Sequence, residues 1–365
     1  MKKTKKRLAS ILLTLVMAMT LFFAAPMTVY AAAPIDPTAT DTWDFVTNIN
    51  TSANGTAGGG TWSWDQSTLT LTLNNVTVNT SAAIALQVPA GTTIILNGTN
   101  SIVSTYDGID STYGIYAKGG ALTITSSSGG TLDATADSES SDNSFGILAD
   151  TSSGNITING NASVVANGGN AGSYSGGIWA DENVTISGSA NVTGTGGTAT
   201  VGDSVGITAY DGTLTISGNA TVQAYGGSAT GNDGGSFGTF YNNEQGLVIN
   251  GGSLTALGDN RALYSDYVVP NEYTYWVNVA NADPGGAGTV SDGNFTITQV
   301  YLFARIVFGT PPATPTPPPG AGGGANGVPQ TSDVNNTLGW TVVLALVMLG
   351  VFGLLAWRRR HRAQE

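Results

Sequence analysis

The chain has 365 residues, 51 glycines, no cysteine, and a charged fraction of only 10% with a net charge of −12. This length allows a sizeable core, but so much glycine with so few charges is unusual for a compact enzyme. The absence of cysteine excludes disulfides and thiol nucleophiles, so stability must come from packing and backbone pairing.

The first segment has the three parts of a secretory signal peptide. Five basic residues lie between Lys2 and Arg7, an apolar run covers residues 11–25, and small residues around Ala31 follow it. This order is typical of an export signal that is removed from the mature protein. We therefore expect a signal peptide over residues 1–31 and an exported protein.

Residues 32–68 are expected to form an N-terminal cap. Trp62 and Trp64 lie in the stretch GGGTWSWDQ, just before the first regular strands. The ends of a stacked β structure expose strand edges and need covers. We expect the two tryptophans to cover the first end.

Residues 69–269 are a repeat. The phrases YGIYAKGGALTI, FGILADTSSGNITI, GGIWADENVTI, VGITAYDGTLTI and FGTFYNNEQGLVI place Gly114, Gly146, Gly177, Gly206 and Gly238 at intervals of 32, 31, 29 and 32 residues. Each copy holds three short runs of period 2, rich in β-branched residues. A propeller would need about 40–50 residues and four antiparallel strands per unit. The repeat therefore predicts an all-β, right-handed parallel β-helix with about 30 residues and three strands per coil.

Alternation along each run predicts three inward columns and one set of corners. The columns are Ile115, Ile147, Ile178 and Ile207; Ile124, Ile158, Ile186, Ile216 and Ile249; and Leu132, Val164, Val192, Val222 and Leu254. The corner glycines are Gly160, Gly188, Gly218 and Gly251, each placed where the chain needs left-handed backbone angles.

After Pro270 the repeat stops and the composition changes twice. Residues 270–309 read as ordinary strands that form a C-terminal β cap, and residues 310–327 form a linker rich in proline and glycine. Residues 328–365 contain an uncharged run over 338–357, followed by RRRHR. That run is long enough for a transmembrane helix, and the basic cluster predicts a cytoplasmic tail.

The exported part is strongly acidic. It holds 22 acids but only Lys118, Arg261 and Arg305 as bases, a net charge of −19. Such a surface repels phosphate backbones, which argues against nucleic-acid binding. The exported part also lacks histidine, and Lys118 and Arg261 lie five rungs apart, about 24 Å at strand spacing. We therefore expect no enzyme, with a polysaccharide lyase as the minor alternative.

One outward position of the repeat is rich in rings. It is the third residue of G-I-x-A, occupied by Tyr116, Leu148, Trp179, Thr208, Phe240 and Tyr264. Flat rings in line on a rigid sheet suit the apolar faces of sugar rings. The four aromatic residues are thus candidates for carbohydrate binding, and the alternative is that another part of the chain covers them.

Acidic residues follow the same strand from rung to rung. They are Asp150, Asp181, Glu182, Asp211 and Glu244. Carboxylates at rung spacing repel one another unless a cation lies between them, and oxygen ligands favour calcium. They are candidate calcium ligands, and the alternative is a solvated acidic surface.

The C-terminal segment resembles the cell-wall sorting signal of Gram-positive surface proteins, L-P-x-T-G. Pro329, Gln330 and Thr331 match that pattern, whereas Val328 and Ser332 depart from it. The resemblance implies cleavage by a sortase after Thr331 and attachment to peptidoglycan, hence a cell-wall location. A plain membrane anchor is the alternative.

The repeats, with phrases such as TLTLNN and GIYA, resemble a carbohydrate-binding β-helix family of clostridial surface proteins, similar in fold to pectate lyases. The resemblance implies non-catalytic binding of an acidic polysaccharide with calcium. The rival hypothesis is an adhesin or structural surface spacer that binds host or neighbouring proteins.

Overall fold

A computed structural model describes residues 40–137, 139, 142–231, 234–242 and 246–309. This part of the chain is all-β, and it contains no helix that is long and apolar enough to cross a membrane. The predicted signal peptide (1–31), linker (310–327) and C-terminal segment (328–365), with its span at 338–357, lie outside the described residues.

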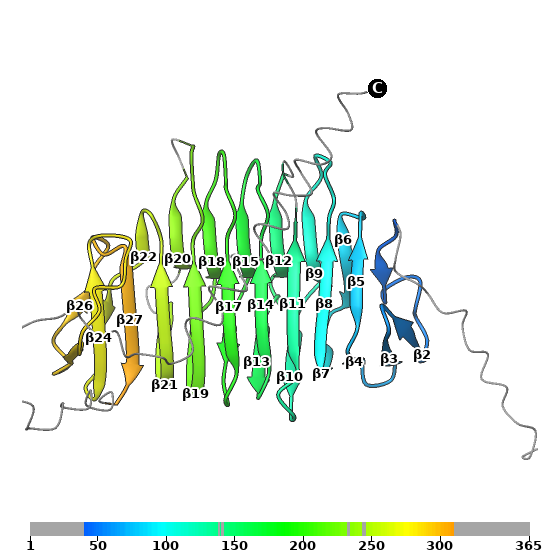
Figure 1. The fold of residues 1–365 in the computed structure, drawn as a ribbon, viewed down its shortest axis with the longest axis horizontal. Coiled ribbons are helices and arrows are strands. Elements are labelled where there is room, and N and C mark those ends of the chain that lie inside the picture. Colours follow the sequence, from blue (N-terminus) through cyan, green and yellow to red (C-terminus); the bar gives the residue numbers. More distant parts are fainter. Residues whose placement is uncertain (1–39, 138, 140–141, 232–233, 243–245, 310–365) are drawn as a thin grey trace, which may run out of the picture. The chain divides into compact units, whose positions relative to one another are not determined.

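The body is a parallel β-solenoid with three strands per turn, as the repeat predicts (Figure 1). Parallel pairing joins residues about one repeat apart, such as Ile147 and Ile178. The first column of strands is β4 (Thr70–Asn74), β7 (Thr92–Asn97), β10 (Leu122–Ser126), β13 (Ile156–Gly160), β16 (Val184–Ile186) and the first parts of β19 (Leu214–Tyr225) and β21 (Leu247–Leu257). The second column is β5 (Thr77–Thr80), β8 (Thr99–Ser104), β11 (Thr131–Ala136), β14 (Ser163–Asn167), β17 (Asn191–Thr195) and the later parts of β19 and β21.

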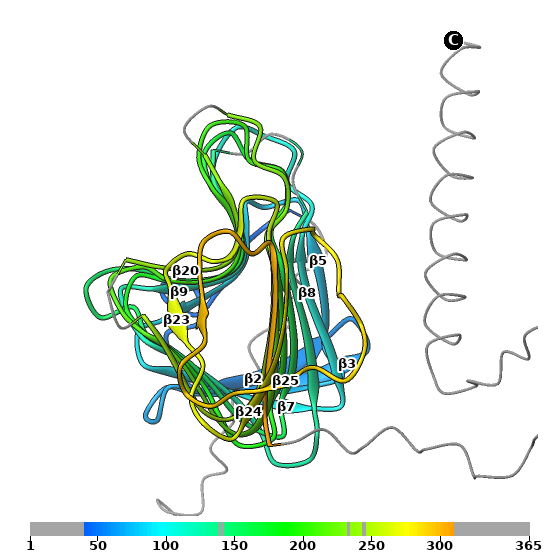
Figure 2. The same ribbon diagram turned by 90° about the vertical axis from the view of Figure 1, so that its left-hand side faces the viewer.

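The third column forms a separate eight-stranded sheet. In spatial order it contains β1 (Trp43–Asp44), β6 (Ile84–Pro89), β9 (Thr112–Lys118), β12 (Ser144–Ala149), β15 (Ser175–Ala180), β18 (Ser204–Ala209), β20 (Ser236–Tyr241) and β22 (Arg261–Leu263). The first two columns, with the capping strands, make one seventeen-stranded sheet because β19 and β21 run through the corner between them without a break. The solenoid core lies between these two sheets (Figure 2).

The three predicted inward columns are confirmed. Their members pair in register from rung to rung, as in Ile124 with Ile158 and Val164 with Val192. All are buried, with at most 3% of any side chain exposed. Each rung therefore removes one aliphatic side chain per strand from water and packs it on its copies above and below.

The corner glycines have the predicted left-handed backbone. Gly160, Gly188, Gly218 and Gly251 have φ of 69°, 73°, 70° and 105°. They also stack closely, because a Cβ on Gly188 would lie 2.8 Å from the carbonyl oxygen of Gly160. Both the backbone angle and the spacing of the corners thus require glycine.

The glycine of G-I-x-A has a different role. A Cβ on Gly177 would lie 2.3 Å from the backbone nitrogen of Thr195, and one on Gly206 would lie 2.3 Å from that of Tyr225. At this position the eight-stranded sheet approaches the second column backbone to backbone. The regular alternation of the strand is interrupted there, since neighbouring strands are paired at the residues before and after this glycine but not at the glycine itself.

The N-terminal end is capped by aromatic residues, as the two tryptophans predict. Strands β2 (Ala53–Ala57) and β3 (Gly60–Asp65) run antiparallel, and β3 pairs with β4, the first strand of the stack. Trp62 and Trp64 are 4% and 2% exposed and pack against Phe45, which also contacts Trp43. This cluster covers the apolar end of the core.

The C-terminal end is capped by antiparallel strands. Strands β24 (Tyr273–Asn278), β25 (Thr289–Val290) and β27 (Phe303–Phe308) extend the large sheet, with β27 on the later part of β21, and β23 (Tyr267–Val268) pairs with β26 (Thr296–Ile297). At the first part of β21 the hydroxyl of Tyr273 accepts a hydrogen bond from Gly251 N–H and donates one to Ile249 C=O, both 2.7 Å long. A single side chain thus satisfies backbone groups that a further strand would otherwise pair.

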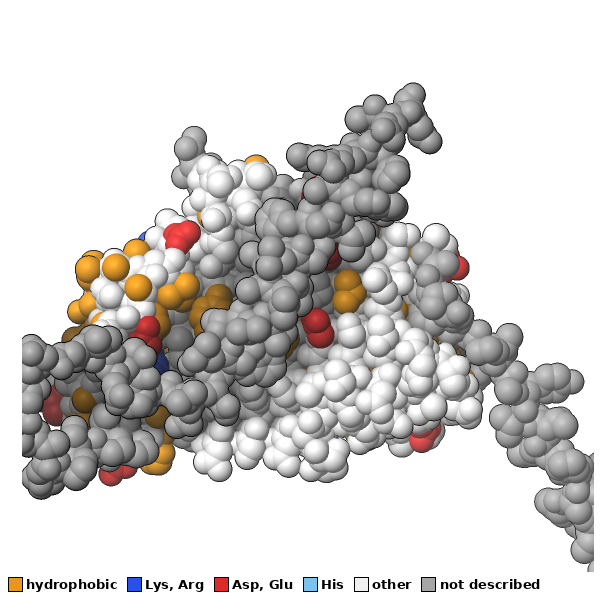
Figure 3. All heavy atoms as spheres, in the orientation of Figure 1, with side chains coloured by type: hydrophobic (Ala, Val, Ile, Leu, Met, Phe, Trp, Pro, Cys, Tyr) orange, Lys and Arg blue, Asp and Glu red, His pale blue; other side chains and the backbone are white. Residues whose placement is uncertain are grey.

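The outward positions of the first column are polar and uncharged over its middle rungs, whereas Asp133 and Val165 lie at outward positions of the second column. Threonine recurs at one outward position of the first column, where Thr93, Thr123, Thr157, Thr185 and Thr215 lie in register. The space-filling view of this side shows mainly uncharged polar surface, with hydrophobic side chains gathered toward the C-terminal cap (Figure 3).

Candidate functional site

The predicted outward column lies on the outer face of the eight-stranded sheet. Tyr116, Leu148, Trp179, Thr208 and Phe240 occupy matching positions on successive strands from β9 to β20. Tyr264 directly follows β22, and its ring lies 4.2 Å from that of Phe240, centroid to centroid. The structure therefore brings all four candidate binding residues onto one face.

Five further rings join this column, and we name the whole set the aromatic row. The added residues are Tyr113, Phe145, Tyr174, Tyr210 and Phe237. Ring contacts run without interruption from Tyr116 through Tyr113, Phe145, Trp179, Tyr210 and Phe240 to Tyr264, with centroid separations between 4.2 and 6.1 Å. The row thus crosses the sheet from β9 to β22.

Regular alternation of inward and outward residues along the strands did not predict the five added rings. Tyr113 and Phe145 precede the closely packed glycine, and the interruption there turns them to the same face as the later x position. Tyr210 follows Ala209 and continues the alternation one step beyond β18. Its ring lies 5.6 Å from Trp179 and 6.0 Å from Phe240, so it bridges the gap that Thr208 leaves in the column.

The rings of the row partly bury one another. Phe145 and Leu148 are only 5% and 7% exposed, so they form a covered floor. Tyr174 and Tyr210 are 42% and 39% exposed, and Trp179 between them is half-buried. Flat aromatic surface therefore remains open to a ligand.

Loops project at both ends of these strands (Figure 2). Longer loops precede each strand, and Ala171, Ala199 and Ala229 in them pair through parallel bridges. A buried serine fixes the base of each loop: Ser204, for example, accepts a hydrogen bond from Gly227 N–H at 2.8 Å and donates one to Gly197 C=O at 2.6 Å. The serine column, which sequence reasoning missed, recurs on the repeat as Ser144, Ser175, Ser204 and Ser236, all 0% exposed.

The acidic column lies at the other end of the strands, beside the row. Asp150 accepts hydrogen bonds from the Tyr116 hydroxyl and from Gly119 N–H, the latter 2.7 Å long. Asp181 accepts from Thr151 N–H at 2.7 Å and from Trp179 Nε1 at 3.0 Å. Burial, together with the bond to Asp150, raises the pKa of Tyr116. These two carboxylates therefore join neighbouring rungs and orient two of the rings.

The predicted calcium ligands do not form a complete set in the described part of the chain. There, no group of three or more His, Cys, Asp or Glu side chains is placed to hold a metal ion. Asp150 and Asp181 are engaged as above, Glu182 directly follows Asp181, and Asp211 lies one rung further on. Glu244 lies outside the described residues. The calcium assignment stays a prediction, and no step of the proposed function depends on it.

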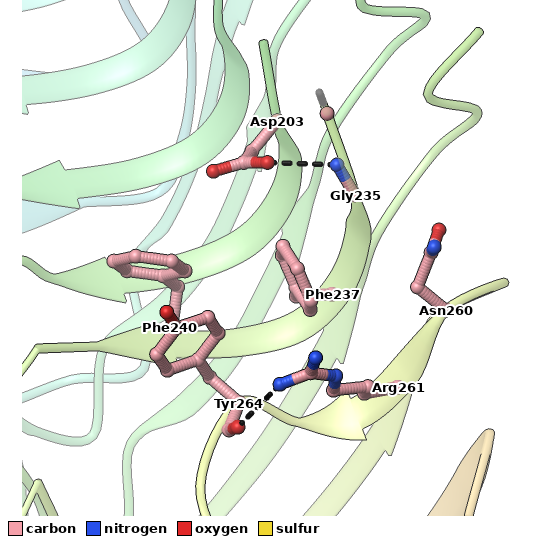
Figure 4. Close-up of a pocket in the computed structure, with 8 residues that line it drawn as sticks. Asp203, Gly235, Phe237, Phe240, Asn260, Arg261 and Tyr264 are labelled. Atoms are coloured by element: carbon pink, nitrogen blue, oxygen red, sulfur yellow. Dashed lines mark hydrogen bonds between the residues drawn. The ribbon is translucent and has the colours of Figure 1, made fainter. Parts of the chain in front are cut away.

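A cavity of about 340 Å³ lies where the row reaches β22 (Figure 4). Its walls include Phe237, Phe240 and Tyr264 from the row, Arg261 and Asn260 from β22 and the turn before it, and Asp203 from the loop before β18. Asp203 accepts a hydrogen bond from Gly235 N–H at 2.7 Å, and its burial raises its pKa.

No family model, curated protein or solved structure matches this chain. The two family resemblances therefore stay interpretations of the sequence. The sorting-signal residues Val328, Pro329, Gln330, Thr331 and Ser332 lie outside the described residues, so wall attachment through Thr331 also stays a prediction.

Proposed function

We propose that this protein binds carbohydrate without cleaving it, along the aromatic row. The observation that carries the proposal is the continuity of the row across the eight-stranded sheet, with Tyr174 and Tyr210 more than a third exposed. Pyranose rings stack on such faces through their C–H groups, and successive residues of a glycan chain would meet successive rings. The rigid solenoid holds the rings in place before binding, which lowers the entropic cost of association.

Polar groups at both ends of the strands support this proposal. Asp142 and Asp150 come from opposite ends, and both lie close enough to Tyr113 to contribute to its raised pKa, although burial contributes most. Carboxylates there can accept hydrogen bonds from sugar hydroxyls that project beyond the stacked faces. Stacking rings flanked by hydroxyl-binding acids suit a glycan with few charges.

The chemistry of the exported part supports binding rather than cleavage. Lys118 in β9 and Arg261 in β22 are separated by five strand-to-strand steps of one sheet, about 24 Å, so they cannot act on one bond. The exported part also contains no histidine to act as a general base.

A glycan array probed with the purified protein tests the proposal. Trp179→Ala and Tyr210→Ala should each weaken binding by about tenfold or more, the loss of one stacking contact of about 1.5 kcal/mol. Phe308→Ala is the matched control, since Phe308 is 53% exposed but belongs to the C-terminal cap. Binding that survives both row variants would overturn the site.

The same array separates the remaining alternatives. Running the array with and without a chelator tests the predicted calcium requirement. Comparing acidic with neutral glycans on it tests the predicted preference for acidic polysaccharide. Release of unsaturated or reducing ends from a bound glycan would indicate a lyase or hydrolase instead. Absence of any glycan signal would favour the adhesin or spacer hypothesis, and loss of the protein from the wall fraction after sortase deletion would test sorting at Thr331.

A further inference from the structure

The aromatic row ends beside an arginine that has an unusual setting. The Arg261 guanidinium lies beside two rings that contact each other, 5.7 Å from the centroid of Phe237 and 5.5 Å from that of Tyr264. Its Nη1 donates to the backbone carbonyl of Tyr264 at 3.2 Å (Figure 4). Two ring faces and one hydrogen bond therefore hold the side chain in one orientation facing the cavity.

This guanidinium has unused hydrogen-bonding capacity. Arginine carries five N–H donors, and the structure shows one bond from Arg261 and no ion pair to it among the described residues. The other arginine of the described part, Arg305, lies 4.0 Å from Asp283 and over the ring of Trp276. Arg261 is thus an ordered cation with donors available to an anionic ligand.

The charge along the row is otherwise negative. Three acids, Asp142, Asp150 and Asp181, lie beside the rings nearer the N-terminal end. The base on the same sheet, Lys118, is five strand-to-strand steps from Arg261. The acid that lines the cavity itself is Asp203. A ligand with a charge on every residue would be repelled along most of the row. A ligand with one carboxylate at the Arg261 end would gain a charge-assisted, bidentate contact there.

The cavity also offers groups for the rest of a sugar ring. Asn260 Oδ1 accepts from Ser236 N–H at 2.8 Å, so its NH₂ group is oriented as a donor. One carboxylate oxygen of Asp203 accepts the bond from Gly235 N–H, and the second oxygen can accept another. Figure 4 shows Asp203 and Arg261 on opposite sides of the Phe237 ring. A volume of about 340 Å³ lies within the usual range of small-ligand sites.

We propose that this cavity is an end subsite for a uronic acid residue, with Arg261 binding its carboxylate while uncharged sugars occupy the rest of the row. The inference rests on the proposed function and deepens it by naming where one charge of the ligand lies. Arg261 supplies the charge recognition, Asn260 and Asp203 meet hydroxyls, and Phe240 and Tyr264 continue the stacking surface.

Ligand-observed NMR with two matched probe pairs tests this subsite. The pairs are methyl β-glucoside with methyl β-glucuronide, and methyl β-galactoside with methyl β-galacturonide. The wild-type protein should bind at least one uronide about tenfold more tightly than its neutral partner. Arg261→Gln should remove that preference for the uronide over its neutral partner, whereas Arg305→Gln, the matched control, should retain it.

The outcomes separate this inference from the proposed function. No uronide preference in the wild-type protein, whether both members of a pair bind or neither does, overturns the end subsite. A preference that persists in Arg261→Gln overturns it as well. The proposed function is decided separately, by the loss of array binding in Trp179→Ala and Tyr210→Ala, neither of which changes the cavity walls.

Discussion

The outer faces of the two sheets differ although the same coils build both. The first column of the seventeen-stranded sheet presents Thr93, Thr123, Thr157, Thr185 and Thr215 in line, whereas the eight-stranded sheet presents the aromatic row. Inside, both bury the same kind of aliphatic column. Since small polar side chains are sufficient outside the first column, the rings outside the eight-stranded sheet are not needed to form the coil. That difference is the reason for proposing the eight-stranded sheet as the binding face.

The corner that joins the first two columns is the most sensitive point. Gly188→Val should abolish folding, because it places a β-branched side chain at φ 73° and a Cβ 2.8 Å from the Gly160 carbonyl oxygen, where neither backbone can move away. Gly129→Val is the control, since Gly129 has φ 83° but no atom within 4 Å of its added Cβ. Thermal melts of both should show a folded Gly129→Val, and equal losses would mean that backbone angle alone matters.

An inner residue of β18, Ile207, and an outer residue just after this strand, Tyr210, should separate stability from binding. Ile207→Ala should lower the free energy of unfolding by about 2–5 kcal/mol, because Ile207 is 0% exposed in the core. Tyr210→Ala should cost about 1 kcal/mol, the loss of its ring contacts, while it weakens glycan binding. Denaturant unfolding together with the array measures both quantities. A larger stability loss for Tyr210→Ala would mean that the row is structural.

The end of the seventeen-stranded sheet depends on one hydroxyl. Tyr273→Phe should cost about 1–3 kcal/mol, because Gly251 N–H and Ile249 C=O lose their partner in a buried position. Tyr301→Phe is the control variant at the end of the eight-stranded sheet. There the backbone carbonyl of Tyr301 accepts a hydrogen bond from Ala262 N–H, and the substitution leaves that bond in place. Denaturant midpoints should fall for Tyr273→Phe and stay nearly unchanged for Tyr301→Phe.

The smallest expected effect concerns Asp203, beside the eight-stranded sheet. Burial raises its pKa above the unfolded value, so its contribution to stability is present at low pH and is lost as pH rises through the folded pKa. Asp203→Asn, which can still accept the Gly235 bond, should therefore slightly raise the melting temperature at pH 7. The difference should vanish near pH 3, below the ordinary aspartate pKa of about 3.9. A lower melting temperature at pH 7 would contradict this.

Much of the fold was predictable from repeated residues, and less of the site. The aliphatic columns and the corner glycines recur at fixed offsets, so period 2 and the repeat length place them. Tyr116, Trp179, Phe240 and Tyr264 followed from the same rule. Tyr113 and Phe145 did not, because the close approach of the backbone at Gly114 and Gly146 interrupts the alternation.

The sequence by itself determined the stacked coil, its inward residues and the face that carries the rings, because these depend on local alternation repeated at a constant interval. Only the tertiary structure decided that Tyr210 bridges the gap at Thr208, that Asp150 and Asp181 bind rings and backbone of neighbouring rungs, and that Arg261 faces a cavity beside Phe237. Most of those contacts join residues of different coils on one sheet, and their geometry depends on the spacing of neighbouring rungs and on the turns that follow the strands.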